Sequence, residues 1–325
     1  MKLSKLLILL MCVLMLFASS CDSQPESDNP TPEPTETDMP EEKNTILYQL
    51  PTQTPQQMMS YVIITKDESC IVIDGGNTGD GNYLLNFLKE KTGKEKPEID
   101  AWFFSHAHSD HVNAFIALVN QKKDEFAVKK IFYNFPSKEF VRTYDSSSVI
   151  ETMDNFHAAV EKLDNTEVII PQEGDKFDIG SVEFEILMVQ DEEANFMRNG
   201  NVVNNSCMIF RMKVEEQTVL FLGDTGVEQG IMLLVKHRDY LKSDMVQMAH
   251  HGQNGVNKKV YETINPSVCL WPTPAWLYNN DNGGGYDSGP WLTIEVRGWM
   301  EELGVKHHFI DKDGLHEIVF PFELD

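Results

Sequence analysis

The stretch that decides the fold reads His106-Ala107-His108-Ser109-Asp110-His111. It begins where an apolar run, 99–105, ends, and that run has the length and composition of a buried strand. From His111 onward, apolar residues recur at the spacing of an amphipathic helix. Several side chains that can bind a metal ion therefore lie close together on a loop between a strand and a helix.

The spacing within this motif predicts two metal ions rather than one. A loop can turn His106 and His108 toward one ion while Asp110 and His111 face a second. Imidazole and carboxylate groups suit zinc, with manganese or iron as alternatives. We therefore expect a cofactor of two divalent ions.

Two later strand ends carry groups of the same kind. Asp224 follows the apolar run 218–222 and is the candidate to bridge the ions, whose mutual repulsion calls for an oxygen donor between them. His250 and His251 follow the run 245–249. Alternation along an extended chain points such neighbours to different sides, so we expect one to bind the second ion and the other to face the substrate. The spacing leaves open which is which, and both remain candidate ligands and, with Asp110, candidate catalytic groups.

These motifs, together with Asp74-Gly75-Gly76, occur in the order and at the strand ends typical of one family. From about residue 46 to 322 the chain resembles the metallo-β-lactamase fold superfamily. That resemblance implies a metal-dependent hydrolase with an α/β fold, a four-layer αββα sandwich of two mixed β-sheets with helices outside. The run Asn204-Asn205-Ser206 and the paired histidines are most similar to the hydrolase domain of competence DNA-uptake proteins, and also to choline-phosphate esterases.

One departure from the family pattern concerns the first ion. Many members supply a further histidine before Asp224, but none lies between His157 and His237, and the corresponding segment offers Asn204 and Asn205. Asparagine is a poor zinc ligand, so we expect the first ion to have His106, His108 and Asp224 only, with room for water or substrate, and the two asparagines to stand behind the ligands. A Cys207 thiolate is an alternative ligand, although a buried thiol fits its apolar surroundings better. Asp74 is expected to support the metal loop by hydrogen bonds.

The first 20 residues have the pattern of an export signal. Lys2 and Lys5 precede a short apolar run, and Ala18-Ser19-Ser20-Cys21 resembles the bacterial lipobox, in which Cys21 becomes the lipid-modified N-terminus. An ordinary signal peptide and an uncleaved anchor are the alternatives. Residues 21–45, rich in Pro, Thr and acids, predict a disordered tether. We expect residues 46–325 to form the hydrolase domain and to be held on the outer face of a bacterial membrane.

Charge and cysteine content limit the possible partners. The chain carries 51 acidic against 27 basic residues, a net charge of −24. Such a surface repels polyanions, so a nucleic-acid partner is not expected. Beyond the signal, Cys70, Cys207 and Cys269 lie in apolar runs and predict buried thiols rather than disulfides.

The expected function is hydrolysis of a phosphoester or phosphodiester in a small-molecule or cell-surface substrate. Metal-activated water would attack, Asp110 or Asp224 would accept its proton, and the second histidine of the pair would stabilise charge or protonate the leaving group. The alternatives are a β-lactam or thioester hydrolase of the same fold and a surface-binding lipoprotein without activity. The aromatic segment 271–286 predicts either a substrate-covering loop suited to a quaternary ammonium or aromatic packing at a domain edge.

Overall fold

Two seven-stranded sheets form the centre of the computed structural model, which describes residues 43–324 apart from 146 and 199–200. The predicted signal, the lipidation candidate Cys21 and most of the predicted tether lie outside the described residues. In the part of the chain that is described, no helix has the length and apolar character needed to cross a membrane.

The first sheet combines an antiparallel edge with a parallel centre. β2 and β3 pair antiparallel, and their side chains are buried on both faces of the sheet. β3, β5, β7 and β8 run parallel to one another. The strands, in sheet order, are β16 (His316–Phe320), β1 (Thr45–Gln49), β2 (Ser60–Ile64), β3 (Cys70–Asp74), β5 (Ala101–Phe103), β7 (Lys130–Phe132) and β8 (Glu167–Ile169).

The second sheet repeats this plan, with an antiparallel meander followed by parallel strands. β9 to β12 pair antiparallel, and β12, β13, β14 and β15 run parallel. In sheet order the strands are β15 (His307–Ile310), β14 (Val268–Trp271), β13 (Met245–Gln247), β12 (Gln217–Phe221), β11 (Ile209–Val214), β10 (Val182–Met188) and β9 (Lys176–Ile179); β4 (Glu98–Ile99) and β6 (Ala127–Val128) form a separate ladder.

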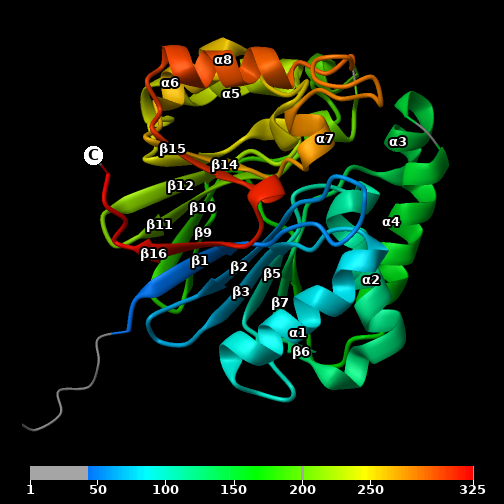
Figure 1. Ribbon diagram of the computed structural model, residues 1–325. Helices are drawn as coiled ribbons and strands as arrows, with labels where there is room; N and C mark the ends of the chain where they lie inside the picture. The colour runs from blue at the N-terminus through cyan, green and yellow to red at the C-terminus, as the bar shows by residue number, and fades with distance from the viewer. Residues whose placement is uncertain (1–42, 146, 199–200, 325) are drawn as a thin grey trace, which may run out of the picture. The chain divides into compact units, whose positions relative to one another are not determined.

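Helices cover the outer face of each sheet (Figure 1). The first sheet carries α1 (Gly81–Thr92), α2 (Ser109–Lys122) and α4 (Ser147–Val160), with α3 (Lys138–Tyr144) beside α4. The second carries α5 (Val227–His237), α6 (Lys258–Ile264) and α8 (Thr293–Glu302), with α7 (Ala275–Tyr278) next to α8. Short 3₁₀ turns are η1 (Thr78–Asp80), η2 (Lys123–Glu125), η3 (Asn195–Arg198), η4 (Asn204–Ser206), η5 (Arg238–Tyr240), η6 (Ala249–Gly252) and η7 (Asp311–Asp313).

Three apolar layers hold these four layers of secondary structure together. The central layer lies between the sheets, where the Phe103 ring stacks on Phe132 and Phe184 with centroids 4.3 and 4.5 Å apart. One outer layer joins the first sheet to α1, α2 and α4, and the other joins the second sheet to α5, α6 and α8. Burial of apolar area on both faces of each sheet is the main force favouring this arrangement.

The predicted αββα architecture is therefore confirmed. Asn204–Ser206 turns as η4, and β11 begins only at Ile209. Cys207 lies in that turn region, and it is a buried free thiol like Cys70 and Cys269, as predicted.

Candidate metal centre

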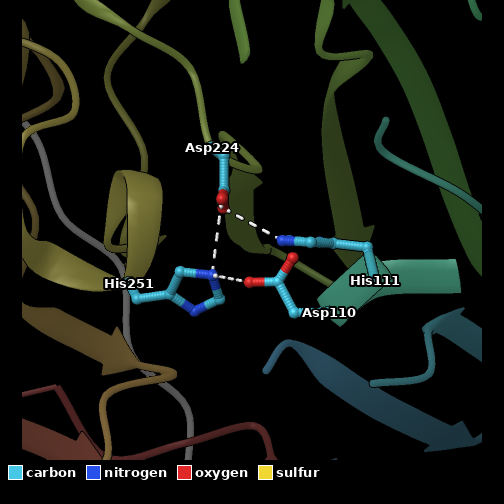
Figure 2. A group of neighbouring side chains, drawn as sticks. All are labelled: Asp110, His111, Asp224 and His251. Atoms are coloured by element: carbon cyan, nitrogen blue, oxygen red, sulfur yellow. Dashed lines mark ion pairs between the residues drawn. The ribbon is translucent and has the colours of Figure 1, made fainter. Parts of the chain in front are cut away.

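The ends of four strands meet at one place between the two halves of the fold. Asp74 ends β3, the motif 106–111 runs from just beyond β5 into α2, Asp224 follows β12, and His250 and His251 follow β13. Carboxyl ends of parallel strands share one edge of a sheet, and facing sheets bring the two edges together. Figure 2 shows Asp110 and His111 from the first half converging on Asp224 and His251 from the second.

The first group of possible ligands contains His106, His108 and Asp224. The His106 Nε2 and His108 Nδ1 atoms are 3.0 Å apart, and His106 Nε2 is 3.8 Å from Asp224 Oδ2. Two ligands at tetrahedral angles around one zinc ion lie roughly 3.3 Å apart, given metal–ligand bonds of about 2.0 Å. The group is thus close to the size that one ion requires.

The second group contains Asp110, His111, Asp224 and His251. His111 Nε2 is 3.3 Å from Asp224 Oδ1, while His251 Nε2 is 3.3 Å from Asp224 Oδ2 and 3.2 Å from Asp110 Oδ2. These separations also match donors arranged around one ion. Asp224 belongs to both groups, which is the position of a bridging carboxylate.

Unsatisfied polar atoms in this cluster fit a bound cation. His111 Nε2, His251 Nε2 and Asp224 Oδ1 are buried and have no hydrogen-bond partner among the described residues. Buried polar atoms are nearly always paired in folded proteins, so several orphans directed at one centre indicate a ligand that satisfies them. Nitrogen and oxygen donors in this combination suit a divalent ion such as zinc.

The Asp74 carboxylate holds the motif in place through hydrogen bonds. Its Oδ1 accepts the Ser105 N–H at 2.8 Å, and its Oδ2 accepts the Ser105 hydroxyl and the His111 Nδ1–H, each at 2.7 Å. Ser105 Oγ in turn lies 3.1 Å from His106 Nδ1. With Nδ1 donating to these oxygens, the Nε2 atoms of His106 and His111 keep the lone pairs that bind metal. This is the supporting role that the sequence predicted for Asp74.

The turn that presents Asp224 is fixed by the side chain of Gln247. Gln247 Oε1 accepts the N–H groups of Leu222 and Gly223 at 2.9 and 2.7 Å, and its Nε2 donates to Gly223 O. The Asp224 N–H donates to Cys207 Sγ at 3.2 Å, so that thiol supports the turn and points at the backbone rather than offering a separate metal site. Burial raises the pKa of Cys207, which disfavours the thiolate.

Asp110 is held by a chain of two glutamines. Gln57 Nε2 donates to Asp110 Oδ2 at 3.0 Å, and Gln253 Nε2 donates to Gln57 Oε1 at 3.0 Å. The sequence predicted neither glutamine, because Gln57 lies far from Asp110 along the chain and in no motif. Ser105 and Gln247 were also missed, although each is a polar residue at or near the end of an apolar run, which is a detectable signal.

His250 and His251 do not alternate as an extended strand would. Both adopt left-handed backbone conformations, with φ of 50° and 55°, inside the turn η6. As a result both Nε2 atoms face Asp224 Oδ2, at 3.9 Å for His250 and 3.3 Å for His251. The expectation that the two rings point to different sides is therefore wrong, and it is His251 that joins the second group.

The two asparagines of η4 have different surroundings. Asn204 Nδ2 lies 3.3 Å from His250 Nε2. Asn205 Nδ2 instead donates to Glu228 Oε2 at 3.1 Å, and its Oδ1 accepts the Gln229 N–H at 3.3 Å. Asn205 thus links η4 to the start of α5.

Electrostatics within the cluster favour charged carboxylates. Burial opposes ionisation of Asp224, but His251 and His111 outweigh it and hold the pKa of Asp224 well below its usual value. Burial likewise opposes charge on His251, yet Asp224 and Asp110 raise the pKa of His251 to about 10. Positive charge beside the carboxylates therefore stabilises their ionised form. Protons on the histidines supply that charge here, and divalent ions would supply it in their place.

A family model described as the metallo-β-lactamase superfamily matches residues 54–262. No curated protein sequence matched the chain.

Among solved structures, the diiron β-hydroxylase CmlA from Streptomyces venezuelae matches with 12% identity and a TM-score of 0.53, over 87% of this chain and 55% of that one. The metallo-β-lactamase fold protein YhfI from Bacillus subtilis matches with 12% identity and a TM-score of 0.49, over 84% and 100%. A diphosphatase of the PhnP family matches with 11% identity and a TM-score of 0.46, over 86% and 100%. At these identities the similarity shows the fold alone.

The predicted metal-dependent hydrolase is consistent with the family match, and the matched region, 54–262, contains every candidate ligand in the two groups. The chain belongs to the metallo-β-lactamase superfamily.

Proposed function

We propose that this protein hydrolyses phosphomonoester or phosphodiester bonds at a two-ion centre. The observation that supports the proposal is that Asp224 is shared between two separate groups of donors, which places one carboxylate between two ion positions. Paired ions suit phosphoryl transfer, because they stabilise both the attacking and the leaving oxygen of an in-line displacement.

The residues that would hold the ions are the two donor groups described above, and zinc is the proposed metal because both are rich in imidazole. The chemistry that the ions supply when bound is activation of water and stabilisation of charge on the phosphoryl group. The chain's own contribution is positioning and proton transfer. Gln57 and His251 both face Asp110 Oδ2, which leaves Asp110 Oδ1 to accept the proton from the attacking water.

A cavity beside the first group offers a place for the substrate. It has a volume of about 520 Å³ and includes His108, Ser109 and Asn113 from the start of α2. Among its described lining residues there is no lysine or arginine, whereas Asp145 and Glu151 are acidic. This lining supports a small-molecule or cell-surface substrate in place of a nucleic acid, because phosphate-backbone binding depends on basic side chains.

The experiment that tests the proposal compares substrates on the purified, metal-loaded protein. We expect turnover of bis(p-nitrophenyl) phosphate or p-nitrophenyl phosphate, with little turnover of nitrocefin or of a chromogenic thioester. The Asp224→Asn variant should lose activity by at least about 100-fold, since it removes the shared carboxylate charge. Turnover of nitrocefin or the thioester without phosphoester hydrolysis would favour the alternative hydrolases, and no turnover of any substrate would favour a binding lipoprotein.

We also propose that the protein is exported and anchored to the outer face of a bacterial membrane through lipid on Cys21. The support is the sequence pattern at residues 1–21 and the acidic segment that follows it. A Cys21→Ser variant should move from the membrane fraction to the soluble fraction after cell disruption. Retention of that variant in the membrane would contradict lipid anchoring.

A further inference from the structure

The paired histidines of η6 share a feature that binding of the second ion by His251 does not explain. Both residues have left-handed φ values, an unusual conformation for a residue other than glycine. Backbone strain of this kind persists only where surrounding contacts impose it, and it often marks a functional site. Here its effect is to aim two neighbouring imidazoles at one oxygen, Asp224 Oδ2.

The Nδ1 atoms of the two rings also have the same kind of hydrogen-bond partner, a backbone carbonyl. His251 Nδ1 faces the Pro272 carbonyl at 2.9 Å, and His250 Nδ1 faces the Asn254 carbonyl at 3.2 Å. A carbonyl oxygen only accepts, so each Nδ1 carries a proton, and Nε2 is the nitrogen left to bind an ion in place of a proton. A backbone acceptor on one nitrogen and a lone pair on the other is the usual arrangement of a metal-binding histidine.

The two donor groups differ in completeness. The second has four donors, whereas the first has three, His106, His108 and Asp224. In the segment where many family members supply a further histidine, this chain has Asn204, which is a poor zinc ligand. The Asn204 amide nitrogen lies 3.3 Å from His250 Nε2. His250 Nε2 is itself 3.9 Å from the carboxylate oxygen that both groups share.

We propose that His250 is the fourth protein ligand of the first ion, so that the motif His250-His251 supplies one ligand to each ion. His250 then replaces the histidine that is absent between residues 157 and 237. Asn204 positions the ring through its contact with Nε2 until the ion takes that lone pair. This inference rests on the proposed two-ion centre, and it revises the expectation that the first ion has only three protein ligands.

The test counts Co²⁺ ions bound by the full-length protein, by equilibrium dialysis and elemental analysis, and records the visible spectrum of the bound Co²⁺. The variant is His250→Asn, because asparagine tolerates a left-handed conformation better than most residues and the backbone should therefore be retained. We expect the variant to keep one ion at wild-type affinity, to bind the other at least tenfold more weakly, and to show a changed Co²⁺ spectrum. Two ions at wild-type affinity with an unchanged spectrum would overturn the proposal.

Two further variants serve as controls. His157→Asn changes a half-buried histidine on α4 outside the cluster and should leave both ions and the spectrum unchanged. His251→Asn should weaken the second ion instead, with a different spectral change from that of His250→Asn. Identical spectra for the two variants would also overturn the assignment of one histidine to each ion.

A measurement on the unmodified protein does not depend on any variant folding. The chain has 10 histidines. In ¹⁵N-histidine spectra recorded during zinc titration, we expect five rings to acquire metal-bound nitrogen shifts, namely those of His106, His108, His111, His250 and His251. Four such rings would contradict the proposal. Failure to hydrolyse any phosphoester would overturn the proposed function and would leave this count of ligands unaffected.

Discussion

At the scale of single residues, Asp74 shows how much of the site depends on a group that binds no ion itself. It is fully buried and has a left-handed φ of 54°, and its two oxygens accept three hydrogen bonds from Ser105 and His111. Both the direction of the metal loop and the tautomer of His111 are set by this carboxylate. Ligand-supporting groups of this kind typically contribute 10–100-fold to metal affinity.

We predict that Asp74→Asn weakens binding of the second ion by about 10–100-fold. Asparagine tolerates the left-handed backbone, but its NH₂ group must face either the Ser105 backbone N–H or the pair formed by the Ser105 hydroxyl and the His111 Nδ1–H. Competition with a metal-sensitive dye measures the affinity. Asp100→Asn is the matched control, since Asp100 also accepts a backbone N–H, from Cys70 at 2.8 Å, but contacts no ligand. Equal affinity in both variants would contradict the role given to Asp74.

At the scale of elements, the turn after β12 has no room for a side chain at Gly223. This glycine has φ of 55°, and a Cβ placed there would lie 3.0 Å from both Cys207 Sγ and the Ser105 Cβ. Its carbonyl also accepts the His250 N–H at 3.0 Å. The turn therefore brings three parts of the site into contact: the motif strand, the bridging aspartate and the paired histidines.

We predict that Gly223→Ala lowers the free energy of unfolding by more than Gly93→Ala does. Gly93, at the end of α1, has a similar φ of 65° but open space around the added Cβ. Gly93→Ala should cost about 1–2 kcal/mol for the left-handed conformation alone. Gly223→Ala should cost about 1–3 kcal/mol more, from overpacking against Ser105 and Cys207. Urea denaturation compares the two, and equal losses would show that the turn can relax.

The turn η7 contributes a pH-dependent contact. Asp311 Oδ1 accepts the Thr52 N–H at 2.7 Å, and Oδ2 has no hydrogen-bond partner among the described residues. Burial raises the pKa of Asp311 to about 6, although the Thr52 N–H opposes this. The folded protein thus holds this proton more tightly than the unfolded chain does, so Asp311 reduces stability as the pH rises from about 4 to about 6.

We therefore predict that Asp311→Asn is more stable than the wild type at pH 8, by about 2 kcal/mol. Asparagine keeps an oxygen for Thr52 and removes the buried charge. At pH 4 the two proteins should be nearly equal, because Asp311 is then largely protonated in the folded state. Urea denaturation in the presence of EDTA at both pH values tests this. Asp313→Asn, at an exposed neighbour, should show no such difference, and a less stable Asp311→Asn at pH 8 would disprove the prediction.

At the scale of the whole molecule, the candidate metal centre joins the two sheets. His106, His108, Asp110 and His111 come from the first half, and Asp224, His250 and His251 come from the second. An ion held by ligands from both halves binds the folded chain and not the unfolded one. Its binding free energy is then added to the stability of the fold.

We predict that metal removal lowers Tm and that zinc restores it. At a free ion concentration of about 1,000 times Kd, each site contributes about 4 kcal/mol, which corresponds to a shift of several degrees in a domain of this size. Differential scanning calorimetry with EDTA, then with added zinc, measures the effect. Asp224→Asn should lose most of the zinc-dependent shift, and a wild-type Tm independent of metal would contradict a centre that joins the halves.

The sequence by itself determined the architecture and most of the candidate ligands of this protein. The fold was predictable because the motifs at the strand ends resemble those of one family in their order, and parallel strands bring residues at their carboxyl ends, such as Asp224, to one edge of a sheet. The spacing within one motif likewise predicted His106, His108, Asp110 and His111 as candidate ligands. Such information is local, or is carried by the order of elements along the chain.

Only the tertiary structure decided how the remaining groups are oriented. Two left-handed residues turn both His250 and His251 toward Asp224, whereas an extended chain would separate them. Gln57 reaches Asp110, and Gln247 fixes the turn at Gly223, through contacts between segments that no spacing rule connects. The physical reason is that side-chain direction depends on backbone dihedral angles and on long-range hydrogen bonds, and both are set only when the two sheets pack together.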